Sequence, residues 1–533
     1  MKKINIQNMI PNFFTQTIIL LLILSCDGIG SDDLNVGGGK GDEFLEITLK
    51  PNTKHQKITG FGASDAWSTQ FVGKNWPLNK RNTIADLLFS EEFDTDGNPL
   101  GIGLDLWRFN IGAGSSYQGN NSNINDEWRR AESFINSNGY NWNAHEGQRW
   151  FVNAAKERGV NQFIAFSNSP PVTMTKNGLA NSSGGTSANI EPSKYGQYVD
   201  FLANVIENYR DLYGVAFNYV SPFNEPQYDW RDGQEGSPWQ NTEIANITKL
   251  LDTKLQEKNL NIKIQIAETA QLNYLYESAN KQGRANQIQD FFNSSSSNYV
   301  GNLTSLHNSI AAHSYFTTFD TSYLIDVRTR VNEKINSVDS SLEFWMTEYS
   351  IIEDNIEING QQRDLGIDPA LYVARLIHTD LTVANASSWQ WWLAVSPYDY
   401  KDGLVYIDHN KNDGEVYESK LLWGFGNYSK FIKPGYNRIG LSRSDNKTAT
   451  QSINGLLVSA YASDDNSKYV TVLVNQRNIE IPVKLGVDGQ DSYVGKVYQT
   501  TALSGDNLRN VGTSSNGNII NIPARSIVTI VIE

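Results

Sequence analysis

Two short motifs place a glutamate at the end of a strand-like segment. Glu225 follows Asn224 in Ser-Pro-Phe-Asn-Glu-Pro (221–226), and Glu348 ends the apolar run Phe-Trp-Met-Thr-Glu (344–348). A pair of carboxyl groups can cleave a glycosidic bond, because one protonates the leaving oxygen while the other attacks the anomeric carbon. We predict that Glu225 is the acid/base and Glu348 the nucleophile of a retaining reaction. The alternatives are a solvated loop carboxylate for Glu225 and a structural, salt-bridged one for Glu348.

These glutamates end two of eight strand-like segments that alternate with amphipathic, helix-like stretches. Several of the segments are nearly continuous apolar runs, as buried parallel strands are. The alternation predicts an α/β fold, a (β/α)8 TIM barrel, although an open doubly wound sheet would alternate in the same way. The eight segments are 58–64, 104–111, 162–167, 216–223, 263–267, 310–315, 342–349 and 387–393.

Polar side chains gather at the carboxyl ends of these segments. A barrel places its active site on the face where its strands end, so this asymmetry favours a barrel over an open sheet. The residues at these ends are Asp65, Asn168, Glu225, Glu268, His313 and Glu348.

A second domain is expected at the C-terminal end. After about residue 431 the chain has short β-type segments with turn residues between them, which predict a small antiparallel β-sandwich side domain. Residues 44–49 alternate in the same way, and we expect them to add a strand to it. The predicted organisation is an N-terminal strand of the side domain (44–55), the catalytic barrel (56–430) and the β-sandwich domain (431–533).

The N-terminus has the pattern of an export signal. Lys2 and Lys3 precede an apolar run (18–24) that ends at Ser25-Cys26, and Cys26 is the only cysteine of the chain. The run is too short for a membrane span and resembles a bacterial lipobox. We predict a lipoprotein signal peptide (1–26) with lipidation at Cys26, and a flexible linker (27–43). The protein would be secreted and lipid-anchored to the outer membrane, facing the surface or the periplasm; the alternative is a cleaved signal with a chance cysteine.

The charge balance limits the partners. The chain has 58 acidic and 44 basic residues and a formal net charge of −14, whereas proteins that bind nucleic acid carry basic patches. We expect a monomer with a saccharide partner, no nucleic acid, and no membrane contact besides the lipid. His145-Glu146 lacks the second histidine of a zinc helix, and 408–419 lacks the glycine and glutamate of a calcium loop. We therefore expect no metal and no cofactor.

Five stretches together resemble glycoside hydrolase family 30 of the retaining (β/α)8 clan. They are residues 60–67, 106–115 and 167–171 and the two glutamate motifs, and the resemblance extends over nearly the whole chain from residue 44. Many members have a tryptophan before the Ser-Pro-Pro turn, whereas this chain has Asn168 in Phe-Ser-Asn-Ser-Pro-Pro. The Asn form favours the endo-β-1,6-galactanase-like branch. The resemblance implies a barrel with a β-sandwich built from both chain ends.

The resemblance also implies a set of substrate-binding residues around the two glutamates. Arg108 would hold Glu348 ionised, or else form a generic salt bridge of the barrel. His313 would line the sugar site, or else be a core histidine, and Glu268 is a further candidate contact. The substrate-binding set is Asn224, Arg108, His313, Tyr315, Trp391, Trp67, Asn168 and Asp65, with Trp391 and Trp67 as sugar-stacking platforms.

The expected activity is therefore retaining hydrolysis of a β-linked polysaccharide, with β-1,6-galactan of arabinogalactan side chains as the leading substrate. Two alternatives remain: a family-30 enzyme that cuts β-1,6-glucan or xylan, and a non-catalytic surface lipoprotein that binds glycans. The retention of Glu225 and Glu348 together with Asn224 and Arg108 argues against the non-catalytic alternative.

Overall fold

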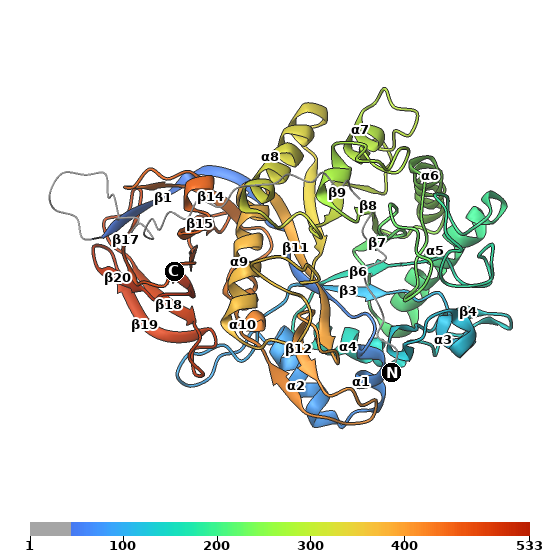
Figure 1. The fold of residues 1–533 in the computed structure, drawn as a ribbon, viewed down its shortest axis with the longest axis horizontal. Helices are drawn as coiled ribbons and strands as arrows, with labels where there is room; N and C mark the ends of the chain where they lie inside the picture. The colour runs from blue at the N-terminus through green and yellow to red at the C-terminus, as the bar shows by residue number, and fades with distance from the viewer. Residues whose placement is uncertain (1–43) are drawn as a thin grey trace, which may run out of the picture.

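The computed structural model describes residues 44–533 (Figure 1). The predicted signal peptide, the lipidation of Cys26 and the linker 27–43 lie outside these residues and stay predictions. Within 44–533, none of the helices combines the length and the apolar composition that crossing a membrane requires.

Eight parallel strands close into a barrel, which confirms the predicted fold class and excludes the open sheet. The hydrogen-bonded order is β10-β9-β8-β7-β6-β3-β2-β11, and β10 pairs with β11 to close the ring. The barrel strands are β2 (Gly60–Ser64), β3 (Leu106–Asn110), β6 (Gln162–Phe166), β7 (Tyr219–Ser221), β8 (Lys263–Thr269), β9 (Leu306–His313), β10 (Glu343–Glu348) and β11 (Ala386–Ser396).

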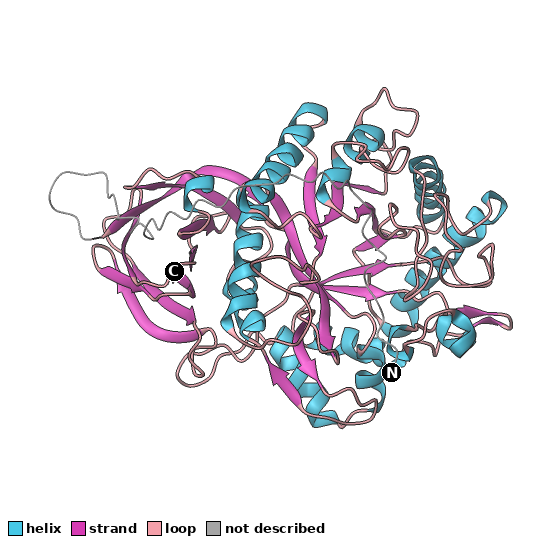
Figure 2. Cartoon of the chain, in the orientation of Figure 1, coloured by secondary structure: helices cyan, strands magenta, loops and turns pink. Residues whose placement is uncertain are grey.

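Helices surround the barrel on its outer side (Figure 2). The longest, α5, buries Val199, Leu202 and Ile206 at helical spacing and ends at Gly214, whose φ of 63° suits a glycine. The helices are α1 (Thr69–Asn75), α2 (Leu78–Phe89), α3 (Ser115–Gln118), α4 (Glu146–Glu157), α5 (Tyr195–Tyr213), α6 (Asn241–Glu257), α7 (Gln287–Phe292), α8 (Thr321–Val338), α9 (Ile367–Thr382), α10 (Lys420–Ser429) and α11 (Ala449–Ser452). Two further strands, β12 (Gly403–Ile407) and β13 (Val416–Glu418), extend the barrel sheet from β11, and β4 (Ile135–Asn136) and β5 (Gly139–Tyr140) form a separate hairpin.

The side domain is a single nine-stranded sheet of order β19-β18-β21-β16-β15-β14-β1-β17-β20. Both chain ends build it, because β1 pairs antiparallel with β14 and parallel with β17. Figure 1 shows this sheet at the left, beside the barrel. Its strands are β1 (Leu45–Lys57), β14 (Asn437–Arg443), β15 (Leu456–Ala462), β16 (Tyr469–Asn475), β17 (Ile481–Val487), β18 (Val494–Thr500), β19 (Arg509–Ser515), β20 (Ile519–Ile522) and β21 (Ser526–Ile532).

The continuous sheet curls, so that its two halves share one apolar core. Leu49 of β1 and Leu485 of β17 belong to the same buried cluster as Val497 of β18 and Ile530 of β21. The sequence pattern predicts strands at 456–462, 469–474, 479–485, 496–500 and 526–532, which correspond to β15, β16, β17, β18 and β21, and it misses β14, β19 and β20. In β19 most side chains are exposed, since an edge strand needs no alternation of apolar residues to pair with its neighbour.

The position of β1 in this core gives a stability prediction. Leu49→Ala should lower the free energy of unfolding by about 2–5 kcal/mol, because Leu49 is fully buried and its truncation leaves a cavity. Denaturant unfolding measures the change. Glu46→Ala on the same strand is the matched control: its side chain is exposed, and we expect a change within about 0.5 kcal/mol. Equal effects of the two variants would contradict the placement of β1.

Candidate active site

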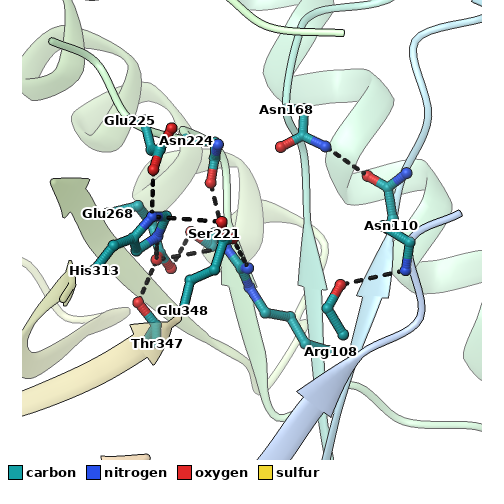
Figure 3. Close-up of polar contacts among 12 residues, drawn as sticks. Arg108, Asn110, Asn168, Ser221, Asn224, Glu225, Glu268, His313, Thr347 and Glu348 are labelled. Atoms are coloured by element: carbon teal, nitrogen blue, oxygen red, sulfur yellow. Dashed lines mark hydrogen bonds and ion pairs between the residues drawn. The ribbon is translucent and has the colours of Figure 1, made fainter. Parts of the chain in front are cut away.

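The two predicted glutamates meet at the carboxyl ends of their strands. Glu225 follows β7 and Glu348 is the last residue of β10. One carboxyl oxygen of each and a ring nitrogen of His313 all lie within 4.8 Å of one another, and all three side chains are buried. Figure 3 shows Glu225, His313 and Glu348 gathered in one cluster of polar contacts. The barrel thus brings together two carboxyl groups that lie 123 positions apart (348 − 225) in the chain.

Glu348 accepts hydrogen bonds at both of its carboxyl oxygens. Arg108 Nη1 lies 2.6 Å from Oε2, and the Tyr315 hydroxyl donates to Oε1 over 3.1 Å. Arg108 is fully buried, and its guanidinium lies 3.8 Å from the centre of the Phe166 ring. Its Nη2 also approaches Asn224 Oδ1 at 3.5 Å. A charge-assisted hydrogen bond of this length orients the Glu348 carboxylate and stabilises its charge.

Glu225 is bound to His313. The His313 ring nitrogen Nδ1 lies 2.8 Å from Glu225 Oε1. Burial raises the pKa of Glu225 to about 7, and the hydrogen bond and positive charge of His313 oppose this rise. A carboxyl group with this pKa carries a proton in a large share of molecules at neutral pH, which suits a general acid.

Glu268, the last charged residue of β8, contacts both His313, which binds Glu225, and Arg108, which binds Glu348. It accepts hydrogen bonds from Ser221 Oγ at 2.9 Å and from Thr347 Oγ1, and its Oε2 lies 3.1 Å from His313 Nε2. Arg108 Nη2 lies 3.5 Å from the same oxygen. Burial alone would raise the pKa of Glu268, but the Arg108 and His313 contacts outweigh it and lower the pKa to about 2. Glu268 is therefore a fixed negative charge.

His313 is held protonated by the carboxylates around it. Burial would lower its pKa, but the Glu348 charge and the hydrogen bonds with Glu225 and Glu268 raise it to about 9. Glu225, His313 and Glu348 are close enough together to hold a metal ion. In the protonated ring both nitrogens of His313 can donate to carboxylates, Nδ1 to Glu225 and Nε2 to Glu268.

The aromatic residues near the site differ from the prediction in one position. Trp67 lies edge-on against Trp392 with ring centres 5.3 Å apart, in a cluster with Phe166 in the barrel interior. The prediction that Trp391 is a sugar platform is wrong: its ring is fully buried against Trp389, and its Nε1 donates to the Asp402 carbonyl. Alternation along β11 points neighbouring side chains to opposite faces, so Trp392 is the residue that faces inward.

A second correction concerns Asp65. Its carboxylate is fully buried and accepts hydrogen bonds from the Asn110 backbone N–H at 2.8 Å and from Gln148 Nε2 at 3.0 Å. Gln148 belongs to helix α4, so the Oδ1 atom of Asp65 is engaged by the protein itself and is not free to bind a sugar. It fixes Asn110 instead, and the Asn168 amide lies 3.4 Å from Asn110 Oδ1 (Figure 3).

Sequence reasoning missed Glu235 as a residue that shapes the site. This fully buried carboxylate accepts hydrogen bonds from the backbone N–H groups of Ala113 and Ser115 and from the Ser115 hydroxyl. It ties the loop after β7 to the loop after β3. No motif marks it. The signal for Glu268 was present, because it lies near the carboxyl end of its strand, as Glu225 and Glu348 do.

A closed parallel barrel with two carboxyl groups converging where its strands end is the architecture of a glycoside hydrolase. The sequence model described as O-Glycosyl hydrolase family 30 matches residues 44–406. The chain belongs to that family, which confirms the resemblance seen in its motifs.

Individual relatives align with parts or all of the chain. An endo-β-1,6-galactanase of Hypocrea rufa is 29% identical over 234 residues, 40% of this chain and 47% of that protein. The glucuronoxylanase XynC of Bacillus subtilis (strain 168) is 27% identical over 194 residues, 36% of this chain and 40% of that protein. The alignments thus span less than half of either relative. A solved structure, a conserved exported protein from Bacteroides fragilis, is 35% identical with a TM-score of 0.86, covering 92% of this chain and 100% of that one.

The His313–Glu225 contact gives a pH prediction. In kcat/KM profiles, activity should fall as pH rises through about 7, because Glu225 loses the proton that it must donate. His313→Asn removes a positive charge that lowers the pKa of Glu225, so the alkaline limb should move up by about one pH unit. His307→Asn, at the start of the same strand, is the control and should leave the limb in place. If the alkaline limb of His313→Asn moved to lower pH, the proposal that His313 lowers the pKa of Glu225 would be refuted.

Proposed function

We propose that this protein is a retaining glycosidase that hydrolyses β-1,6-linked galactan, with Glu225 as acid/base and Glu348 as nucleophile. The observation that carries the proposal is the separation of the two carboxyl groups, whose nearest oxygens lie within 4.8 Å. Retaining enzymes have carboxyl groups about 5–5.5 Å apart, whereas inverting enzymes leave about 6.5–9.5 Å for a water molecule.

In the first step, a Glu348 oxygen attacks the anomeric carbon of a β-linked sugar. The bond from that carbon to the leaving oxygen breaks, and Glu225 transfers its proton to this oxygen, so the leaving chain departs as an alcohol. The product is a glycosyl ester on Glu348 with inverted configuration. Arg108 and Tyr315, which donate to Glu348, orient the attacking carboxylate.

In the second step, the Glu225 carboxylate takes a proton from water while the water oxygen attacks the same carbon. The bond to Glu348 breaks, and the second inversion restores the β-configuration. Glu225 is protonated again and Glu348 is again a carboxylate. His313 supports this second step, because its positive charge beside Glu225 stabilises the carboxylate form that activates water.

Neighbouring residues are suited to bind the sugar. The Asn224 amide lies beside Glu225, where it can reach a ring hydroxyl, and its Oδ1 is oriented by Arg108. Trp67 and Trp392 supply apolar surface in the same interior cluster as Phe166. A sugar ring packs well on such surfaces, since its C–H faces are apolar.

The galactan specificity rests on the Hypocrea rufa galactanase, which is the relative with the longest alignment reported above. Asn168, which replaces the tryptophan of many members, also favours the galactanase-like branch. The xylanase relative keeps xylan as an alternative substrate. The Arg108–Glu348 and His313–Glu225 contacts speak against a non-catalytic glycan-binding protein, because binding alone needs neither.

Azide rescue tests the two roles. With an activated aryl β-glycoside, Glu348→Ala should lose about 10⁴-fold or more in kcat, and azide should restore turnover by giving the inverted α-glycosyl azide. Glu225→Ala should instead give the β-glycosyl azide, because the intermediate still forms and azide replaces water. Product configuration is read by NMR.

Glu343→Gln, at the start of the same strand as Glu348, is the matched control and should form no azide product. Full activity in Glu348→Ala would refute the mechanism. Exchanged product configurations would reverse the two roles.

A polysaccharide panel tests the substrate. We expect kcat/KM on β-1,6-galactan to exceed that on β-1,6-glucan and glucuronoxylan by about 100-fold, since hydroxyl-reading sites discriminate strongly. Products are separated by chromatography, with Glu348→Ala as the inactive control. Release from xylan or glucan alone would overturn the galactan proposal and leave the mechanism intact. Binding without release from any polysaccharide would favour a non-catalytic protein.

A further inference from the structure

A cationic cavity lies between the side domain and the barrel, away from the glutamates. Its volume is about 430 Å³, and β1, β14, β15, α9 and α11 contribute its lining. Four of the lining residues carry a positive charge and none carries a negative charge: Lys50, Arg438, Arg443 and Lys447. In a chain with a formal net charge of −14, a cavity lined by one sign of charge focuses a positive potential.

Among the described residues, 44–533, Arg438 has no carboxylate partner. Its Nε donates to Gln56 Oε1 at 2.9 Å and its Nη2 to Asn385 Oδ1 at 2.7 Å, and both acceptors are neutral amides. Within residues 44–533, no acidic oxygen lies within 4.0 Å of its guanidinium. Burial lowers the pKa of Arg438 only to about 10, so the side chain stays charged at neutral pH. A half-buried charge without a counter-charge is costly, and a bound anion would offset that cost.

The other charged residues of the cavity do not compensate the positive charge of Arg438. Arg443 is paired with Asp445 at 2.8 Å, but Lys50 and Lys447 are exposed lysines at the rim. His378 is buried, and burial lowers its pKa to about 3, so the ring is neutral. Its Nδ1 lies in the cavity wall without a hydrogen-bond partner among the described residues. A neutral imidazole can donate one hydrogen bond to a ligand or accept one from it.

A second, polar cavity of about 290 Å³ adjoins the first and shares His55 with it. Its lining includes amide and hydroxyl side chains, among them Asn332, Asn336 and Ser341. It also includes Glu343, the first residue of β10, whereas Glu348 is the last residue of that strand. The two cavities therefore lie toward the amino ends of the barrel strands, the end opposite to the glutamates.

We propose that the cationic cavity is a second, non-catalytic site that binds a sugar carrying a carboxylate, such as a uronic acid. Guanidinium and ammonium groups bind an oxyanion by charge-assisted hydrogen bonds. The volume lies within the range of about 300–1,000 Å³ of small-molecule sites, which is more than a bare ion needs. The hydroxyl groups of Thr53, Thr382 and Ser452 in the lining suit a polyhydroxylated ligand.

The site is independent of which linkage the glutamates cut. If the cationic cavity binds an acidic sugar of a polysaccharide, the enzyme stays attached to that polysaccharide. The catalytic residues at the other end of the barrel can then act on the glycan chain that is cleaved. An enzyme that is held in this way gains effective concentration at its substrate.

Isothermal titration of the whole protein with D-glucuronate tests the proposal, with D-glucose as the neutral counterpart and sulfate as the bare oxyanion. Glucuronate should bind about tenfold or more tightly than glucose and more tightly than sulfate. Arg438→Gln should weaken glucuronate binding about tenfold. The double variant Lys50→Gln/Lys447→Gln should weaken it in the same direction, and its exposed positions leave the core intact.

Two controls locate the binding. Lys249→Gln removes an exposed charge on α6, which contributes nothing to this cavity, and should leave the affinity unchanged. Glu348→Gln should also bind glucuronate normally, which separates this site from the proposed activity. Absence of glucuronate binding, or binding that both cavity variants leave unchanged, would overturn the proposal. Binding of sulfate at least as tight as that of glucuronate would overturn the sugar part of it.

Discussion

The buried contact between Arg108 and Glu348 is the interaction on which the site depends. Two charges removed from water are stabilised only by close pairing and additional donors, and removing one partner of such a pair costs about 3–5 kcal/mol. In this site the Arg108–Glu348 pair belongs to a longer chain of charged contacts. Arg108 also approaches Glu268, Glu268 contacts His313, and His313 contacts Glu225. These side chains form one charged network around Glu225. Burial raises the pKa of Glu225 and the charge of His313 lowers it, so its carboxyl group stays near the balance between its protonated and ionised forms, which both steps of a double displacement require.

The barrel makes this network possible through the geometry of its strand ends. Arg108, Glu268, His313 and Glu348 come from four different strands, and parallel strands that close into a ring direct their carboxyl ends to one face. The register between β9 and β10 shifts between Met346 and Glu348, so that consecutive residues, Thr347 and Glu348, both contact charged groups of the interior. A regular strand would turn one of them outward.

The opposite end of the barrel meets the side domain, which both chain ends build. β1 lies between β14 and β17 and continues directly into the first barrel strand. The junction places Lys50 of β1, Arg438 of β14 and His378 of α9, residues far apart in sequence, in the lining of one cavity. One molecule thereby carries a proton-holding cluster at one end of its barrel and a cationic cavity at the other. The two differ in kind: the charged side chains of the first contact groups of opposite charge, whereas Arg438 in the second contacts only neutral amides among residues 44–533.

The sequence by itself determined the fold class and the two central glutamates. Strand periodicity and strand-end chemistry are local properties, so the eight segments and the positions of Glu225 and Glu348 follow from residues that are neighbours in the chain. The tertiary structure decided what depends on which side chains meet. It moved Asp65 and Trp391 out of the candidate binding set, because one contacts an outer helix and the other packs in the core. It made Glu268 the centre of the charge network and assembled the cationic cavity from segments up to 410 positions apart (Lys50 to Ala460). Long-range contacts of this kind leave no local pattern in the sequence, since burial and charge pairing are set only when the chain has folded.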